Sequence, residues 1–139
     1  MILLDTNIVS ALMRRTPEPA VVAWLDGQPR GSVWTTSVTV LEVQFGLRIL
    51  PASRRRTLLL HAFEQLVSQL LEGRIAPFDT AAAGEAATLM AERQRQGRPG
   101  DLRDTMVAGV ALAHRATLAT RNTRHFADLR VRVVDPWST

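Results

Sequence analysis

The chain has 139 residues, of which 46% are apolar, and this is enough for one domain whose core needs no disulfide or structural metal. Because cysteine is absent, a zinc site built on thiolates and a disulfide framework are both excluded. The first residues lack the basic and apolar regions of a secretion signal, and no apolar stretch reaches the length of a membrane span. We therefore expect a cytoplasmic protein with no membrane-spanning segment.

All 17 basic residues are arginines, and the formal net charge is +4. We ascribe most of the preference for arginine over lysine to a coding bias. If several of the 13 acidic residues gather in one pocket, the rest of the surface is more basic than the net charge indicates. The charge balance therefore favours a phosphate-rich partner. The absence of lysine also excludes a nucleotide-binding P-loop.

Strands and helices alternate along the chain. In chain order we predict a strand at 2–4, helices at 6–14 and 18–27, a strand at 32–36, helices at 38–50 and 53–72, a strand at 74–78, helices at 79–96 and 101–115, and strands at 116–120 and 131–135. The helix at 38–50 carries apolar residues too densely for a surface helix. This alternation predicts an α/β fold over a single domain, residues 1–139: a three-layer α/β/α sandwich with a mostly parallel central sheet.

Two acidic residues stand at unusual places in this pattern. Asp5 directly follows the first strand, and sites in parallel sheets form beyond the carboxyl ends of strands. The alternative is that Asp5 only caps the following helix. Glu42 lies among apolar residues and shares a helical stripe with Thr39 and Gly46. The alternative is a stripe that faces water, but a glycine inside a helix often leaves room for something to approach.

Asp104 repeats this pattern near the start of the helix at 101–115. Its stripe continues through Ala108 and Ala111, small residues that leave space beside a carboxylate. Asp101 follows the break "GRPG" three residues earlier, where we expect it to cap the helix. Asp104 is therefore the candidate ligand of the two.

Three carboxylates in one cleft, those of Asp5, Glu42 and Asp104, need compensation of their charge. At ~4 Å and an effective dielectric constant near 20, each pair of like charges costs on the order of 4 kcal/mol, so the site must take up protons or a cation. Oxygen ligands without cysteine or paired histidine select Mg²⁺, or Mn²⁺ in its place. Hydrolysis of a phosphodiester with the help of the metal is the chemistry that such a site favours.

Four segments of the chain together resemble a known family. "MILLDTNIVS", "TTSVTVLEVQFG", "GRPGDLRDTMVAGVALAH" and "ATLATRNTRHF" stand in the order found in PIN domains of the VapC/FitB type, the toxic ribonucleases of bacterial toxin–antitoxin pairs. The resemblance implies a Mg²⁺-dependent endoribonuclease, a homodimer that is held inactive by a cognate antitoxin of the VapB/FitA kind and binds operator DNA only with that antitoxin. It places the family's catalytic, metal-binding acids at Asp5, Glu42 and Asp104.

The resemblance also assigns supporting residues and shows one departure. Thr6 and Asn7 match the turn after the first strand, and Thr120 matches the small polar residue at the end of the fourth strand. The family often has a fourth acid at the position of Asn122 or of His125, and neither is acidic here. Asn122 still offers a neutral oxygen to a metal or its water, whereas a lone histidine in a loop is more often structural or solvated.

Basic residues near the predicted acids are the candidate RNA contacts, because arginine pairs well with phosphate. They are Arg98, Arg121 and Arg124. The competing interpretation is a catalytically weak or inactive PIN-fold module that acts by binding, as a corepressor with its antitoxin. The missing fourth acid favours that alternative, and the three intact acids favour the nuclease.

Overall fold

A single parallel sheet forms the centre of the molecule. The computed structural model describes residues 1–138, and five strands pair in the order β3-β2-β1-β4-β5, every pair parallel. The strands are β1 (Ile2–Leu4), β2 (Val33–Thr36), β3 (Ile75–Ala76), β4 (Thr117–Ala119) and β5 (Val133–Val134). The predicted parallel sheet is therefore confirmed.

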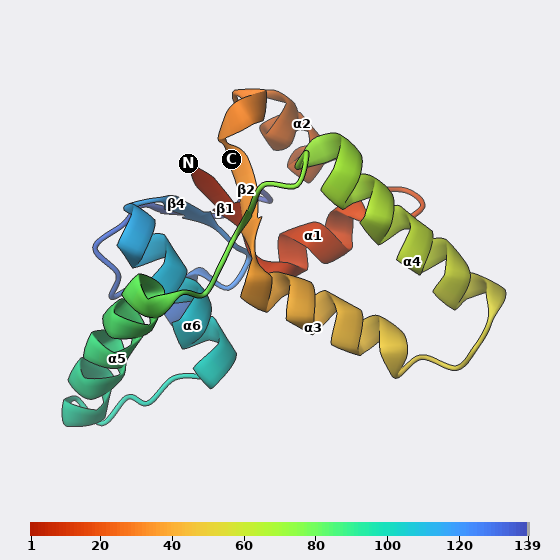
Figure 1. Cartoon of the computed structure of the whole chain (residues 1–139). Coiled ribbons are helices and arrows are strands. Elements are labelled where there is room, and N and C mark those ends of the chain that lie inside the picture. The colour runs from red at the N-terminus through yellow and green to blue at the C-terminus, as the bar shows by residue number, and fades with distance from the viewer. Residues whose placement is uncertain (139) are drawn as a thin grey trace.

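Helices fill the connections between the strands (Figure 1). They are α1 (Thr6–Leu12), α2 (Pro19–Asp26), α3 (Ser37–Arg48), α4 (Arg54–Gln65), α5 (Thr80–Arg95) and α6 (Leu102–His114). Short 3-10 helices lie at Arg30–Ser32 and Thr123–Phe126. The helix predicted at 53–72 is present, but its last part, Leu66–Leu70, changes to a π-helical hydrogen-bond pattern.

The helices cover both faces of the sheet, because alternate residues of β1 point to opposite sides. Leu3 packs with Leu89 of α5 and Val107 of α6 in one buried cluster. Leu4 packs with Ile8 of α1 and with residues of α2, α3 and α4 in a second cluster. Figure 1 shows α5 and α6 on one side of the strands and the other four helices opposite. The predicted three-layer α/β/α sandwich is confirmed.

The order of the strands creates a crevice at one edge of the sheet. β1 is central, with β2 on one side and β4 on the other, and Leu4 is in register with Thr35 and Ala119. The three strands therefore end side by side, and Asp5 and Thr120 directly follow two of them. Such a switch point, where successive connections leave in opposite directions, is where open parallel sheets place their sites.

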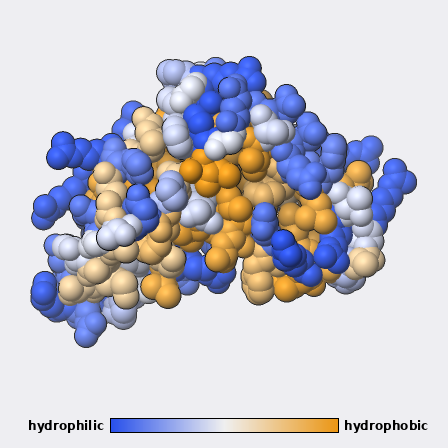
Figure 2. Space-filling view, viewed as in Figure 1, coloured by the Kyte–Doolittle hydropathy of each residue, from blue (hydrophilic) through white to orange (hydrophobic). Residues whose placement is uncertain are grey.

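α3 lies on the surface, so the expectation that its segment is too apolar for a surface helix is wrong. Val43 and Leu47 are buried against the sheet, but Leu41, Phe45 and Ile49, spaced four residues apart, are 57%, 54% and 67% exposed. The helix is thus apolar on its outer stripe as well as its inner face. Figure 2 shows hydrophobic side chains gathered on the surface over this helix.

The described residues 1–138 contain no helix that is both long and apolar enough to cross a membrane. The longest α-helix among them, α5, spans 16 residues, which is below the ~20 residues that a membrane span requires.

Candidate active site

Asp5 is held rigidly at the junction of β1 and α1. It caps α1, because its Oδ1 accepts a hydrogen bond of 2.9 Å from the backbone N–H of Thr6. Its Oδ2 accepts a hydrogen bond of 2.8 Å from the hydroxyl of Thr120, across the sheet edge. Asn7 Nδ2 lies 3.5 Å from the same oxygen. The sequence left a helix-capping role and a functional-site role as alternatives for Asp5. In the structure Asp5 caps α1 and also lies near other charged side chains.

Burial disfavours the charged form of Asp5. Asp5 is only 3% exposed. This burial is the main cause that raises the pKa of its carboxyl above the usual value. Hydrogen bonds from Thr120 and Thr6 oppose this rise, whereas the negative charges of Asp104 and Glu42 add to it. The site is therefore short of positive charge near Asp5.

Glu42 reaches the same region from the middle of α3. Its Oε1 accepts a hydrogen bond of 2.9 Å from the hydroxyl of Thr6, and its Oε2 lies 3.9 Å from Arg103 Nη1. The Glu42 side chain is 20% exposed, so it is turned inward and is not part of a solvated stripe. A Cβ on Gly46 would meet nothing within 4 Å. No part of the described chain uses the room that this glycine was expected to leave.

Asp104 lies in the first turn of α6. Asp101 caps this helix as predicted, since its Oδ1 accepts a hydrogen bond of 3.1 Å from the N–H of Asp104. Asp104 Oδ2 is 2.9 Å from Nδ1 of His125. Ala108 and Ala111 are fully buried in the core. Their small size serves packing against the sheet, and they leave no open space beside Asp104.

The three acids line one hollow of about 410 Å³ at the carboxyl edge of the sheet. Residues lining it include Asp5, Thr6, Asn7, Glu42, Asp104, Arg121 and Asn122. Within the described part of the chain, no three acidic or histidine side chains come close enough together to enclose an ion by themselves. The three acids thus line the hollow without closing around a common centre, so an ion held there would need water or substrate oxygens to complete its shell.

Polar residues at the end of β4 connect the hollow to α1. The Thr120 hydroxyl accepts hydrogen bonds from Asn7 Nδ2 at 3.3 Å and from the N–H of Asn122 at 3.1 Å, while it donates to Asp5. Asn7 Oδ1 accepts the N–H of Arg121 at 3.0 Å. The resemblance had assigned supporting roles to these positions, and in the structure Asn7 and Thr120 orient the carboxylate of Asp5.

Comparison with known proteins adds to this geometry. The family model described as "PIN domain" matches residues 2–131. The chain is 38% identical to VapC ribonuclease Y4jK of Sinorhizobium fredii over 99% of this chain and 98% of that one, and 36% identical to toxin FitB of Neisseria gonorrhoeae over 99% of both chains. This chain is a PIN domain of the VapC/FitB type. It also resembles the solved structure of FitAB bound to the IR36 DNA fragment, with a TM-score of 0.88, 36% identity and coverage of 99% and 96%.

His125 is a neighbour of the acids in this PIN domain, although the sequence favoured a structural or solvated role. Its ring nitrogen contacts Asp104, and its side chain is 58% exposed. Asn122 lines the hollow, and among residues 1–138 its side chain has no hydrogen-bond partner. The two positions where the family often has an acid therefore both adjoin the site.

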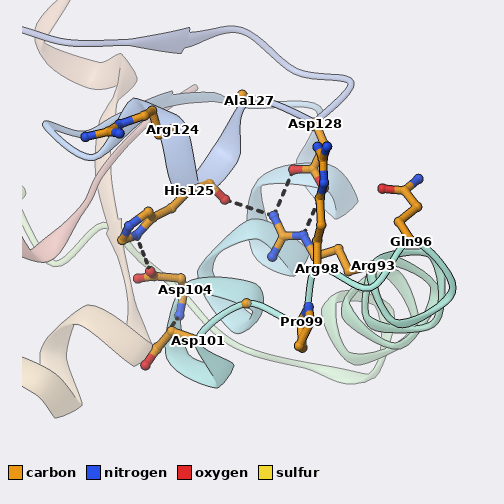
Figure 3. Close-up of a pocket in the computed structure, with 11 residues that line it drawn as sticks. Arg93, Gln96, Arg98, Pro99, Asp101, Asp104, Arg124, His125, Ala127 and Asp128 are labelled. Carbon is orange, nitrogen blue, oxygen red and sulfur yellow. Dashed lines mark hydrogen bonds and ion pairs between the residues drawn. The ribbon is translucent and has the colours of Figure 1, made fainter.

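Arg93 is a residue that sequence reasoning missed. It is 5% exposed and donates to both carboxylate oxygens of Asp128 at 2.9 Å, to Thr105 Oγ1 at 3.1 Å and to the His125 carbonyl at 2.9 Å (Figure 3). The hydrogen bond with Asp128 is the main cause that raises the pKa of Arg93 and lowers that of Asp128. One signal was available: Arg93 continues the apolar stripe of α5 four residues after Leu89.

The three predicted RNA contacts lie at two different places around the acids of the PIN domain. Arg121 lines the hollow of the three acids, and its guanidinium carbon lies 4.7 Å from the ring centroid of Trp137. Arg98 and Arg124 line a second hollow on the other side of Asp104. All three arginines are exposed.

Proposed function

We propose that this PIN domain is the toxin of a type II toxin–antitoxin pair and acts as a metal-dependent endoribonuclease that hydrolyses RNA phosphodiester bonds. The observation that carries the proposal is that Asp5, Glu42 and Asp104, from three separate elements, line one hollow at the switch point of the sheet. The similar protein of Sinorhizobium fredii is named a ribonuclease, and that of Neisseria gonorrhoeae a toxin.

The donor set of the hollow suits Mg²⁺, with Mn²⁺ as a substitute. Asp5, Glu42 and Asp104 offer oxygen, and the raised pKa of Asp5 indicates that a positive charge would relieve the site. When bound, the ion supplies an activated water and stabilises charge at the phosphorus. Asn122 offers a neutral amide oxygen in place of a fourth acid, so a second ion is held less tightly.

The remaining residues orient the acids and hold the substrate. The Thr6 hydroxyl donates to Oε1 of Glu42, and the Thr120 hydroxyl donates to Oδ2 of Asp5, so that both carboxylates are held in fixed orientations at the hollow. Arg121 stands at the rim of the hollow, where its guanidinium can pair with an RNA phosphate. The Arg121 backbone is fixed by Asn7, which places this cation relative to Asp5.

We propose that the antitoxin binds a groove between α1 and α4. The groove has a volume of about 1270 Å³, and its apolar floor includes Leu12 and the 56% exposed Leu58. Its four basic residues are Arg14, Arg15, Arg54 and Arg55. An amphipathic segment with acidic side chains complements such a surface. Arg14 lines both this groove and the hollow of the acids, so a segment bound there reaches the edge of the active site.

We further propose a homodimer, with the exposed stripe of Leu41 and Phe45 on α3 and Ile49 at the C-terminal end of this helix as the contact between two copies. Such an apolar stripe is costly to leave in water. We propose that the protein binds operator DNA only together with its antitoxin, and the solved FitAB structure bound to the IR36 DNA fragment supports this. RNA as the substrate places its action in the cytoplasm.

The decisive experiment is cleavage of labelled RNA by purified protein with increasing Mg²⁺. Wild type should cleave, and Asp5→Asn or Asp104→Asn should reduce the rate by at least a hundredfold while the melting temperature stays within a few degrees. Growth of cells that express the toxin without antitoxin should be arrested by wild type and not by these variants. Equal toxicity of the variants would contradict a toxic nuclease.

The second candidate function is a binding module that represses transcription with its antitoxin and has little catalytic power. Asn122 at a position where the family often has an acid is the observation that favours it. The cleavage experiment separates the two, because a binding module would give no cleavage at any Mg²⁺ concentration and would still bind operator DNA with the antitoxin.

A further inference from the structure

A second hollow of about 520 Å³ adjoins the site and has no role in the function proposed above. It is formed by the end of α5 with the turn after it, the start of α6, and the Thr123–Phe126 helix (Figure 3). Asp104 lines both hollows, and Arg124 and His125 also line a shallow hollow with Arg121 and Asn122. An RNA strand that crosses the three acids would therefore continue into this space.

The charged side chains of the second hollow leave two arginines available to a ligand. Asp128 is paired with Arg93, and Asp101 caps α6. Arg98 and Arg124 form no side-chain hydrogen bond within residues 1–138, and the charge of Arg98 contributes to the lowered pKa of Asp128. The lining carries three arginines and three aspartates, so its formal charges balance. Within residues 1–138, Arg98 and Arg124 are the arginines of the lining that have no carboxylate partner, and each can pair with a phosphate.

The floor of the second hollow is fixed before any ligand arrives. The Arg93 guanidinium is buried and joins α5 to Thr105 on α6 and to the carbonyl of His125. A Cβ added at Gly100 would lie 2.9 Å from Arg93 Nη1, so a larger residue at this position would fill the hollow or displace the guanidinium. The space is therefore preorganised, which lowers the entropic cost of binding.

The size and the ends of the hollow suit one nucleotide. A volume of about 520 Å³ lies in the range of pockets that hold single small ligands. Figure 3 shows Arg124 and His125 on the left of the view and Arg98 nearer its middle, alongside the Arg93 and Asp128 pair. Gln96, at the rim, carries an amide that can both donate to and accept from a base edge.

We propose that this hollow is a subsite for the nucleotide that adjoins the cleaved phosphodiester, with Arg124 near the scissile side and Arg98 contacting the next phosphate. The inference rests on the proposed ribonuclease function. It assigns the length of RNA that the enzyme grips beyond the acids, and it makes Arg98 a binding residue that lies outside the catalytic hollow.

Salt dependence of RNA binding tests the subsite without cleavage. In an Asp5→Asn background, the affinity for a labelled single-stranded RNA is measured over a range of salt concentrations. Arg98→Ala should weaken binding about tenfold and reduce the slope of log K against log salt by about 0.7, the value for one lost contact with a single strand. Arg98→Lys should keep the slope, because it keeps the charge.

Arg95→Ala is the matched control, since Arg95 is an exposed arginine of the same helix end that does not line the hollow. Arg98→Ala with the same slope and affinity as Arg95→Ala would overturn the subsite. In the wild-type background, the loss caused by Arg98→Ala should lie in KM and should shrink on RNA trimmed by the adjoining nucleotide. Normal cleavage without these effects refutes only the subsite. The slope effect without any cleavage refutes the nuclease, and with it the subsite as a part of a cleavage site, and leaves the hollow as an RNA-binding surface.

Discussion

Replacing Arg93 by methionine should loosen the segment that carries His125 beside Asp104. The substitution keeps the aliphatic stem but removes four hydrogen bonds, two of them to Asp128. Thr105 keeps its hydrogen bond to the carbonyl of Asp101, so it is not left unpaired. The affected groups are therefore the carboxylate of Asp128 and the carbonyl of His125.

The expected loss follows from the exposure of these groups. Removal of one partner of a fully buried ion pair costs about 3–5 kcal/mol, because the other charge is stranded. The side chain of Asp128 is 42% exposed and can regain water, so we expect a smaller loss in the free energy of unfolding. An estimate of about 2 kcal/mol follows, of which about 1 kcal/mol is coupling between the two side chains. For a chain of this size this lowers the melting temperature by about 8 °C.

Urea unfolding of Arg93→Met, Asp128→Asn and the double variant measures this coupling, with Arg95→Met as the control. The folded pKa of Asp128 is lowered, so its contribution is present above the unfolded pKa and is lost as pH falls through the folded value. The coupling should therefore be seen at pH 7 and fade in acid, as the pH falls below the unfolded pKa and through the lowered pKa of Asp128. A coupling energy of zero at pH 7, or one that does not change at acid pH, would refute the reasoning. RNA cleavage by Arg93→Met should also slow more than cleavage by Arg95→Met.

Three further predictions concern the proposed site and surfaces. The folded pKa of Asp5 is raised, so its negative charge lowers stability increasingly as pH rises from the unfolded pKa through the folded pKa. Asp5→Asn should therefore raise the melting temperature in EDTA at pH 8 and not at pH 3. An equal shift at both pH values would contradict this. Asn122→Asp adds a charge and should lower the Mg²⁺ concentration for half-maximal RNA cleavage, whereas identical midpoints would mean that residue 122 does not face the metal. Phe45→Asp should convert a dimer to a monomer in sedimentation, because it places a charge on the proposed dimer contact. Leu58→Asp should weaken antitoxin capture at least tenfold and leave the dimer intact. The reverse pattern would mean that α3 binds the antitoxin and that the groove between α1 and α4 forms the dimer.

Much of the fold could be predicted because local signals agreed with the global pattern. The aliphatic run before Asp5, the cap at Asp101 and the break at residues 97–100 each mark an element boundary that the structure contains. The exposed outer stripe of α3 could not be predicted in this way. Apolar density measures how much a helix avoids water, but it does not say whether the same chain or a second one covers it.

The candidate site was only partly visible in the sequence. Asp5 and Asp104 could be identified as candidates because one follows a strand and the other follows a helix cap. Arg93 and His125 make their contacts with residues 12 to 35 positions away in the chain. Spacing along one element shows which side chains share a face. It does not show which carbonyl or carboxylate a neighbouring element brings to that face. The Arg93 network depends on such an approach, and only coordinates reveal it.

Asp5 both lines the hollow and caps α1, and this affects how an inactive form of the protein should be made. The carboxylate that lines the hollow also accepts the N–H of Thr6 and so starts α1. Alanine at this position would remove the charge and the cap together, and loss of a cap alone costs about 1 kcal/mol. Asparagine caps a helix about as well as aspartate does. For trapping uncleaved RNA or for producing the toxin without harm to the host cell, Asp5→Asn therefore separates lost chemistry from a weakened first helix, and Asp5→Ala does not.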